Sequence, residues 1–568
     1  MNRILLALFI ALFPIYFVSG DEEPVAGIGS SELDEITPAS AILFVRVSGL
    51  DKTIGIVSYI FNNIIFNDYS VGVTQWVNTF KRKTDIDIYD VQSVRKAGID
   101  TKRPLALACL KGKGESEDML IFLPIKSDNF YLKFIKIIQR ANTNRSDIDL
   151  DPIIASYKRH RVGQVLKDIF FTTVDDYFIL TSSGGSIKRI IDLKAGETNE
   201  ISIVDDPLYK AYKGRIERIS DINIFLKREF VKEYIYNKDV GGNKYKTSSL
   251  KEKAFIKKQY ISETEKTDTG QREFPKRGQI KKESKLDSIN YIGLSLKIES
   301  TEIDIKVDLG MNNESLYAKT LKEILKIGMA GRALYVENPL VYYYSSIDTK
   351  VLQSIWKRGN NVMSDGYDLT LFTKNITHSF GIDLTNYFVS YPIDFYNFVI
   401  EKSKLDKGFD NYIIFYPLQD KSENSKLWKS IKKEMDKKYR KTGRFGEEGG
   451  GIDSFWYKSL HGNKMNFVAI DRGFCIGNNL QFLYSTINTI EKNICDMNYR
   501  QFKKVDNQTF FVSYVKFDEG NQFKQILMLL TSSKPALYRL INRMRSVFVI
   551  GKRVDSNLSF DMRINFCQ

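Results

Sequence analysis

Histidines, clustered carboxylates and glycine-rich turns are the groups in this chain that could perform catalysis or hold a metal ion. The three histidines are His160, His378 and His461, and they stand far apart in the sequence. A metal site or a histidine-based triad would require distant segments to converge on one point. We interpret all three as isolated surface residues, and we predict no catalytic residue, no metal site and no cofactor.

A short run of alternating carboxylates is similar to the start of a calcium-binding loop. Asp147, Asp149 and Asp151 form the pattern D-x-D-x-D. Pro152 stands where such a loop requires glycine, and Lys158 stands where it requires glutamate. We therefore predict no calcium site of this type.

Three other polar motifs are better explained by local backbone structure than by chemistry. Asp85, Asp87 and Asp90 are spaced as strand-edge and helix-cap carboxylates. The turn 182–186 is rich in Ser and Gly and precedes a helical pattern, so it could cradle an anion. The turn is not followed by the Gly-Lys-Ser/Thr arrangement of a nucleotide-binding loop, and we therefore predict a capped strand-to-helix turn. The glycines of 443–451 lack the strand and helix of a dinucleotide site and indicate a flexible loop.

The cysteines have no metal-type spacing and leave two interpretations open. They are Cys109, Cys475, Cys495 and Cys567. One disulfide among the last three is the first interpretation, and buried free thiols in strands are the second.

Much of the formal net charge of +15 lies in one segment. Between Lys238 and Lys285 the sequence has 14 Lys and Arg against 7 Asp and Glu, a net of +7 in 48 residues, with almost no apolar periodicity. We interpret 238–285 as a disordered basic insertion. It could contact anionic lipid or a polyanionic cell-wall polymer, although a role in solubility alone is the simpler explanation.

A basic helix pattern near residue 437 offers a second surface of the same kind. It could dock on anionic lipid, although a solvated helix face is the simpler explanation. Nucleic acid is not an expected partner, because export would remove the target and no motif combines basic with stacking side chains. The candidate contact residues for a polyanion or membrane are Lys257, Lys258, Lys276, Arg277, Lys281, Lys282, Lys437 and Lys438.

The N-terminus has the three parts of a signal peptide. Arg3 precedes an apolar run of roughly 15 residues, which is shorter than the roughly 20 needed to span a bilayer, and small residues precede the acidic Asp21. We predict a signal peptide over 1–20, an exported linker over 21–35, and a periplasmic, envelope-associated or secreted protein. An uncleaved membrane anchor is the alternative. No later stretch is long and apolar enough to span a membrane.

The chain that follows is organised around a strand-and-helix unit that occurs twice. The apolar run 119–125 leads into an amphipathic helical pattern at 129–138, and the run 413–418 leads into another at 427–439. Each unit then continues with a hairpin around an acidic turn, near Asp175 in the first and Asp471 in the second. Each closes with two alternating strands around a serine-containing turn, so one face of the sheet is predicted to be wet and the strands antiparallel.

The lengths of the two units also agree. The first, 36–311, has 276 residues, or 228 without the basic insertion, and the second, 335–568, has 234. We therefore predict an α+β protein with two tandem homologous domains, each an antiparallel sheet packed against helices. A helical linker over 312–334 joins them.

This order of features resembles a family of exported bacterial proteins known only as a domain of unknown function. The resemblance lies in the Pro-led first strand, the Gly98-Ile99-Asp100 step, the acidic hairpin turn, the Ser/Gly turn into a helix and the closing hairpin. It implies an envelope location and brings no catalytic residues.

The function predicted from the sequence is a non-enzymatic binding or structural module of the cell envelope. Its partner would be an envelope protein, anionic lipid or cell-wall polymer. A carrier of a lipid or other apolar ligand is the alternative, favoured by 37 Phe and 31 Tyr. A hydrolase with an unrecognised site is the third.

Overall fold

The computed structural model describes most of the chain after residue 31. The described residues are 32–51, 71–88, 90–111, 117–127, 130–142, 153–166, 168–215, 220–232, 285–299, 301–325, 327–328, 333–346, 396–402, 411–417, 421–448, 453–458, 462, 464–470, 473–488, 497, 501–517, 524–525, 528 and 541–566. The predicted signal peptide and all of the basic insertion except Lys285 lie outside this set. The Asp147–Asp151 motif, His378 and His461 lie outside it as well.

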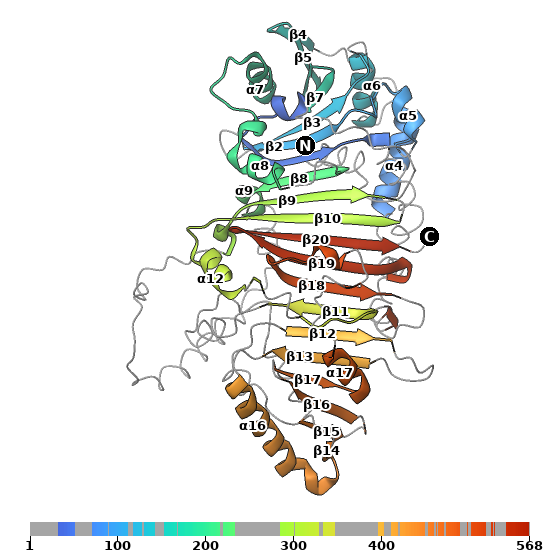
Figure 1. Cartoon of the computed structure of the whole chain (residues 1–568). Helices are drawn as coiled ribbons and strands as arrows, with labels where there is room; N and C mark the ends of the chain where they lie inside the picture. The colour runs from blue at the N-terminus through green and yellow to red at the C-terminus, as the bar shows by residue number, and fades with distance from the viewer. Residues whose placement is uncertain are drawn as a thin grey trace, which may run out of the picture.

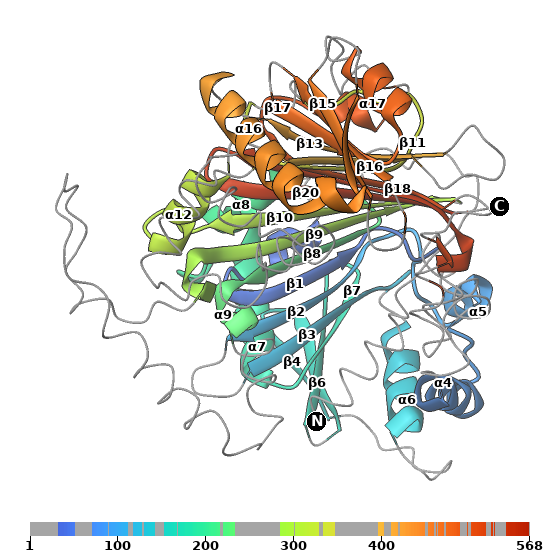
Figure 2. The ribbon, with the colours of Figure 1, turned by 90° about the horizontal axis from the view of Figure 1, so that it is seen from below.

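Helices and one large antiparallel sheet make up the described residues, which confirms the α+β class. The sheet has 20 strands within this part of the chain, and it runs without a break from β4 at one end to β14 at the other (Figure 1). The strands twist strongly along this line, as Figure 2 shows from below. The two predicted units therefore share one sheet. The division into two domains stays a prediction.

The first ten strands lie side by side in an order that differs from their order in the chain. This order is β4-β5-β6-β7-β3-β2-β1-β8-β9-β10. Their bounds are β1 Ala41–Val47, β2 Leu105–Lys111, β3 Glu117–Pro124, β4 Ile153–Tyr157, β5 His160–Leu166, β6 Ile169–Val174, β7 Tyr177–Thr181, β8 Ile222–Lys227, β9 Ile289–Ile298 and β10 Glu302–Met311.

The second ten strands repeat that order from the opposite end of the sheet. The order is β14-β15-β16-β17-β13-β12-β11-β18-β19-β20. Their bounds are β11 Pro339–Ser345, β12 Tyr396–Glu401, β13 Asn411–Pro417, β14 Phe445–Glu448, β15 Ser454–Lys458, β16 Lys464–Ile470, β17 Gly473–Gly477, β18 Thr509–Lys516, β19 Met544–Val554 and β20 Asn557–Phe566. Each strand of the second half thus occupies the place of the strand ten positions earlier.

The halves meet where β10 pairs with β20, and this pairing has an approximate two-fold centre. Glu302 and Asn557 each follow a two-residue turn at the start of their strand. Lys306 and Asp561 are each four residues further on, and they are direct cross-strand partners. Equivalent positions of the two halves therefore face each other at the middle of the seam.

Helices cover both faces of the sheet in the first half. On one face, α5 and α6 pack against apolar residues of β1, β3 and β7, and α4 packs on α6. On the other face, α2, α7 and α8 pack against Phe44, Phe122 and Phe225. The bounds are α2 Glu32–Ile36, α4 Val71–Thr84, α5 Val91–Lys96, α6 Tyr131–Asn142, α7 Gly184–Ala195 and α8 Pro207–Lys213.

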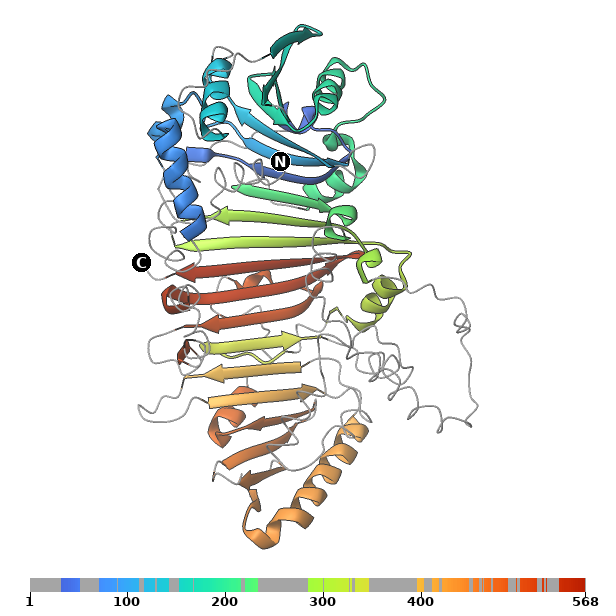
Figure 3. The same ribbon diagram turned by 180° about the vertical axis from the view of Figure 1, so that it is seen from behind.

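The second half carries helices in corresponding places. α16, Lys421–Tyr439, follows β13 as α6 follows β3, and α17, Leu480–Ile487, follows β17 as α7 follows β7. α16 lies at the end of the molecule remote from β4 (Figure 3). The helix in the predicted linker is α12, Leu316–Ile324, and it packs on β10, β18 and β20 near the seam.

Most of the predicted local structure is confirmed where it is described. Gly98 has a left-handed φ of 100° directly after α5, as expected of a helix-ending glycine. Asp90 accepts hydrogen bonds from Gln92 and Ser93 and caps α5. The apolar stretch before the Asp175 turn belongs to two strands, because β5 ends at Leu166 and β6 begins at Ile169, and these two residues pair. The turn that starts α7 is present, although the Ser183 side chain makes no capping hydrogen bond.

Candidate functional site

The strongest candidate for a binding surface in the described residues is the outer face of α16. The helix begins four residues after β13 and ends in a short 3-10 turn, Arg440–Thr442, before Gly443 adopts a left-handed φ of 66° and the chain enters β14. In Figure 1 α16 lies at the lower end of the sheet, beside the strands from β14 to β17.

The inner face of α16 is fixed by an aromatic core. Its buried residues recur at intervals of three or four, the spacing of one helix face. The Trp428 ring lies 4.9 Å from Phe455, and the Phe455 ring stacks at 4.6 Å on Phe467. The α16 residues in this core are Leu427, Trp428, Ile431, Met435 and Tyr439. Because large side chains fill the space between helix and sheet, the orientation of α16 is set by packing.

Ion pairs hold one flank of the helix to the strands. Lys432 Nζ lies 3.1 Å from Asp453 and 3.2 Å from Glu447, and Arg440 lies 2.9 Å from the same Glu447. Burial alone would lower the pKa of Lys432, but its hydrogen bonds to these two carboxylates outweigh that effect and raise the pKa. A hydrogen bond to Asp436 likewise raises the pKa of Arg440. These two cations are therefore already neutralised within the protein.

Four lysines of α16 and one of the 3-10 turn after it form an exposed stripe opposite the core. Between 421 and 441 the chain has 9 Lys and Arg against 3 Asp and Glu, a net of +6 in 21 residues. The intervals of three and four residues place the stripe on one side of the helix. Its members, called the lysine face of α16, are Lys426, Lys429, Lys433 and Lys437 of the helix and Lys441 of the 3-10 turn that follows it, all of them exposed. Such a row of ammonium groups attracts an extended or planar anion.

The predicted contact residues separate into two groups. Lys437 lies on the lysine face, and Lys438 is exposed beside it with its ammonium 5.3 Å from the centre of the Tyr439 ring. The other six, Lys257, Lys258, Lys276, Arg277, Lys281 and Lys282, lie outside the described residues. The helix itself was predictable, because a lysine-rich run with apolar residues at helical spacing is visible without a structure.

The described parts of the other chemical motifs have structural explanations. His160 is half-buried, and its Nδ1 lies 3.1 Å from the Thr173 carbonyl oxygen. Cys109 and Cys475 are buried in strands, and burial raises the pKa of the Cys475 thiol. Cys495 and Cys567 lie outside the described residues. No group of three or more potential metal ligands occurs among the residues that the structure describes.

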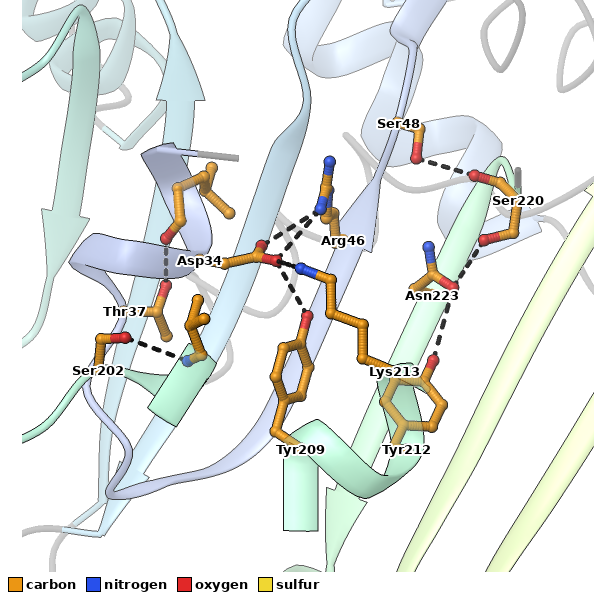
Figure 4. A network of polar contacts seen from close by, with 12 residues as sticks. Asp34, Thr37, Arg46, Ser48, Ser202, Tyr209, Tyr212, Lys213, Ser220 and Asn223 are labelled. Atoms are coloured by element: carbon orange, nitrogen blue, oxygen red, sulfur yellow. Dashed lines mark hydrogen bonds and ion pairs between the residues drawn. The ribbon is translucent and has the colours of Figure 1, made fainter. Parts of the chain in front are cut away.

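The first half contains a buried ionic network that no sequence motif indicates (Figure 4). Asp34 of α2 is fully buried, and its carboxylate lies 3.3 Å from the Arg46 guanidinium of β1 and 2.8 Å from Lys213 Nζ of α8. The Tyr209 hydroxyl donates to the same carboxylate at 3.3 Å. Burial, followed by the nearby Asp34 charge, raises the pKa of Tyr209. Side chains of β1 and of the distant α8 thus converge on one carboxylate of α2, which has a structural role.

A small hollow lies at the seam between the halves, where β10 pairs with β20. It has a volume of about 50 Å³, which is room for a few water molecules. Lys297, Lys306 and Arg563 contribute to its lining, together with Asp304 and Asp561. Arg563 pairs with Asp304 through two contacts of 2.6 and 2.7 Å. This hollow is too small for a lipid or another apolar ligand.

Comparison with known proteins identifies no relative from which a function could be transferred. No family model matches the sequence, and no curated protein matches it. Solved structures that resemble part of the chain include crystal form I of TP0453, with 8% identity, a TM-score of 0.23, and coverage of 51% of this chain and 82% of that one. Crystal form III has 8% identity and a TM-score of 0.25, with 55% and 90% covered. At TM-scores this low, the similarity supports no inference about the fold or the function of this chain.

Among the helices in the described part of the chain, none combines the length and the apolar character needed to cross a bilayer.

Proposed function

We propose that this chain is an exported, non-enzymatic protein of the cell envelope that binds a polyanionic surface through the lysine face of α16. The observation that carries the proposal is the rigid presentation of five exposed lysines along one side of a helix whose other side is fixed in an aromatic core. A preorganised array binds with a smaller loss of conformational entropy than flexible lysines do.

The identical strand order of the two halves supports a related inference, that the chain arose by duplication of a unit of about ten strands. The basic face is then a specialisation of one copy. α6 occupies the place of α16 in the first half, and its exposed cations are fewer: Lys133, Lys136 and Arg140. Unequal charge on equivalent helices favours a role for α16 that α6 does not share.

The alternative functions receive less support from the described residues. A lipid carrier needs an apolar cavity between sheet and helices, whereas the aromatic side chains under α16 contact one another at ring distances of 4.6 to 5.3 Å. A hydrolase would need His378 or His461 to meet carboxylates in a cleft, and both histidines lie outside the described residues.

The test is binding to vesicles and to a soluble polyanion. Triple substitution of Lys429, Lys433 and Lys437 by Gln should weaken binding to vesicles that contain phosphatidylglycerol by up to about 100-fold, since each surface lysine contributes about 1 kcal/mol. Vesicles of pure phosphatidylcholine should not bind. Long-chain polyphosphate, measured in parallel, separates a polymer ligand from a lipid one.

The matched control is the same charge change on α6, in which Lys133, Lys136 and Arg140 become Gln. It should leave binding within about twofold, because those side chains lie on a different helix at the other end of the sheet. Equal losses in the two triple variants would show that only net charge matters, and the proposal would then be wrong. Removing 238–285 from each variant measures what the insertion adds.

A further inference from the structure

The outer edge of the first half ends in a strand without the protection that its counterpart has. β4 is the last strand at that edge in the described residues, and it pairs with β5 on one side only (Figure 1). Its sequence, Ile-Ile-Ala-Ser-Tyr, contains no charged residue. The side chains of Ile153 and Ile154 are 72% and 42% exposed. Uncharged, exposed edge strands are templates for pairing with another chain.

The equivalent edge of the second half is protected by two features. β14 is only four residues long, and its Phe445 is buried under α16. Glu447 of β14 is held by Arg440 and Lys432, so charged side chains surround this edge. Short length and charge are the usual means by which proteins prevent edge pairing. The contrast between two equivalent edges of one sheet indicates that the open β4 edge has a partner.

The direction of the backbone groups on β4 follows from its turn. Tyr157 and His160 flank the two-residue turn Lys158–Arg159, whose φ angles are both left-handed. In such a hairpin the flanking pair exchanges both hydrogen bonds, and the direction alternates along the strand. The N–H and C=O groups of Ile154 and Ser156 therefore point away from β5, toward the free edge.

We propose that β4 pairs antiparallel with β4 of a second copy of this chain, in a register centred on Ala155. In this register Ile154 of each copy lies opposite Ser156 of the other copy. The outward N–H and C=O groups of both residues therefore form hydrogen bonds between the two strands. It places Ala155 opposite Ala155 at the closest approach of the strands, where Cα atoms are about 4.5 Å apart. It also places Ile153 beside the Tyr157 ring of the other copy.

A second copy fits this edge better than a chain of other chemistry for two reasons. The strand has no charge, so self-pairing brings no like charges together, and nothing on it would select a charged peptide. The chain already joins its own halves by antiparallel pairing of equivalent strands, β10 with β20. Because β14 is protected, the contact closes as a two-fold dimer and does not extend into a fibre. With only five residues on each side, the dimer is weak.

Sedimentation velocity of the full chain over a range of concentrations tests the proposal. The wild type should show a monomer–dimer equilibrium. Ile154→Lys should weaken dimerisation by at least about tenfold, because a two-fold contact loses the same cross-strand pair twice. Ser156→Pro should have a similar effect without loss of fold, since it removes only an outward N–H group. Thermal unfolding of each variant confirms that the fold is retained.

Further variants test the location of the dimer contact and the register of the paired strands. Ile201→Lys changes an isoleucine that is 50% exposed but lies outside the edge, and it should leave dimerisation unchanged. Ala155→Cys should form an intermolecular disulfide under mild oxidation, whereas Ser156→Cys should not, because only residue 155 faces its own copy. A monomeric wild type at all concentrations, or equal effects of Ile201→Lys and Ile154→Lys, would overturn the proposal.

Discussion

Loss of the Asp34 carboxylate is the most informative perturbation of the fold. Asp34→Asn keeps the shape of the side chain and removes the charge that pairs with both Arg46 and Lys213. The Asp34 side chain is 0% exposed and that of Arg46 is 11% exposed, so the guanidinium would stay buried without a counter-charge. Breaking a buried ion pair in this way costs about 3 kcal/mol. Lys213 adds little, because its side chain is 41% exposed and can turn to water.

Urea unfolding followed by circular dichroism measures the change in the free energy of unfolding. For a unit of about 200 residues, a loss of about 3 kcal/mol lowers the Tm of that transition by roughly 6 to 12 °C. The control is Asp205→Asn, whose partner Lys210 and whose own carboxylate are both 59% exposed, and it should change stability by less than about 0.5 kcal/mol.

The double variant Asp34→Asn with Arg46→Met tests whether the unpaired Arg46 guanidinium causes the loss of stability in Asp34→Asn. Replacing both charges by neutral groups removes the unpaired guanidinium, so the double variant should be more stable than Asp34→Asn alone. A change below about 1 kcal/mol for Asp34→Asn would refute the account of a buried ionic anchor. Failure of Arg46→Met to recover stability would refute it as well.

Two further predictions concern a carboxylate and a turn. Burial alone would raise the pKa of Glu200. Hydrogen bonds from Arg189 and Ser40 outweigh that effect and lower the pKa below its ordinary value of 4.5. The stability that Glu200 contributes is therefore complete above pH 4.5 and is lost as the pH falls through the lower folded pKa, so unfolding curves of Glu200→Gln and wild type should converge in acid. At Gly98 an added Cβ would lie 2.3 Å from the Phe130 ring, whereas at Gly196 it would meet nothing within 4 Å. Gly98→Ala should thus destabilise by about 2 kcal/mol more than Gly196→Ala in the same unfolding assay, and equal losses would contradict the clash.

The elements that the sequence predicted well are those fixed by neighbouring residues. The hairpin of β6 and β7 turns at Asp175 and Asp176, which both have left-handed φ angles, and the closing hairpin turns at Asp555. An acidic pair between two apolar runs carries that information locally. α6 and α16 were found in the same way, because their apolar spacing has the period of a helix.

What the sequence could not show depends on contacts between distant residues. Asp34 lies in an acidic run, Glu32 to Glu35, which reads as solvent-exposed. Its partners include Lys213, 179 positions further along the chain, and Arg46 of β1, and these contacts make it a buried anchor. Asp308 belongs to the face of β10 that was predicted to be wet, yet it is fully buried beneath the Tyr291 hydroxyl, and burial raises its pKa. Alternation shows which side chains share a face, but it does not show what covers that face.

The charges along the seam explain why the halves pair with each other. In the register of β10 with β20, Asp304 faces Arg563 and Lys306 faces Asp561, so unlike charges meet. If β10 paired with a second β10 about the same centre, Lys306 would face its own copy and Asp304 would face Asp308, so like charges would meet. The two strands therefore differ in charge in a way that favours β10 with β20 over self-pairing. β4, at the other edge of the same ten-strand unit, has no charge that opposes self-pairing. The charges of β10 thus favour pairing with β20 of the other half, whereas β4 carries no charge that would oppose the proposed pairing with a second copy.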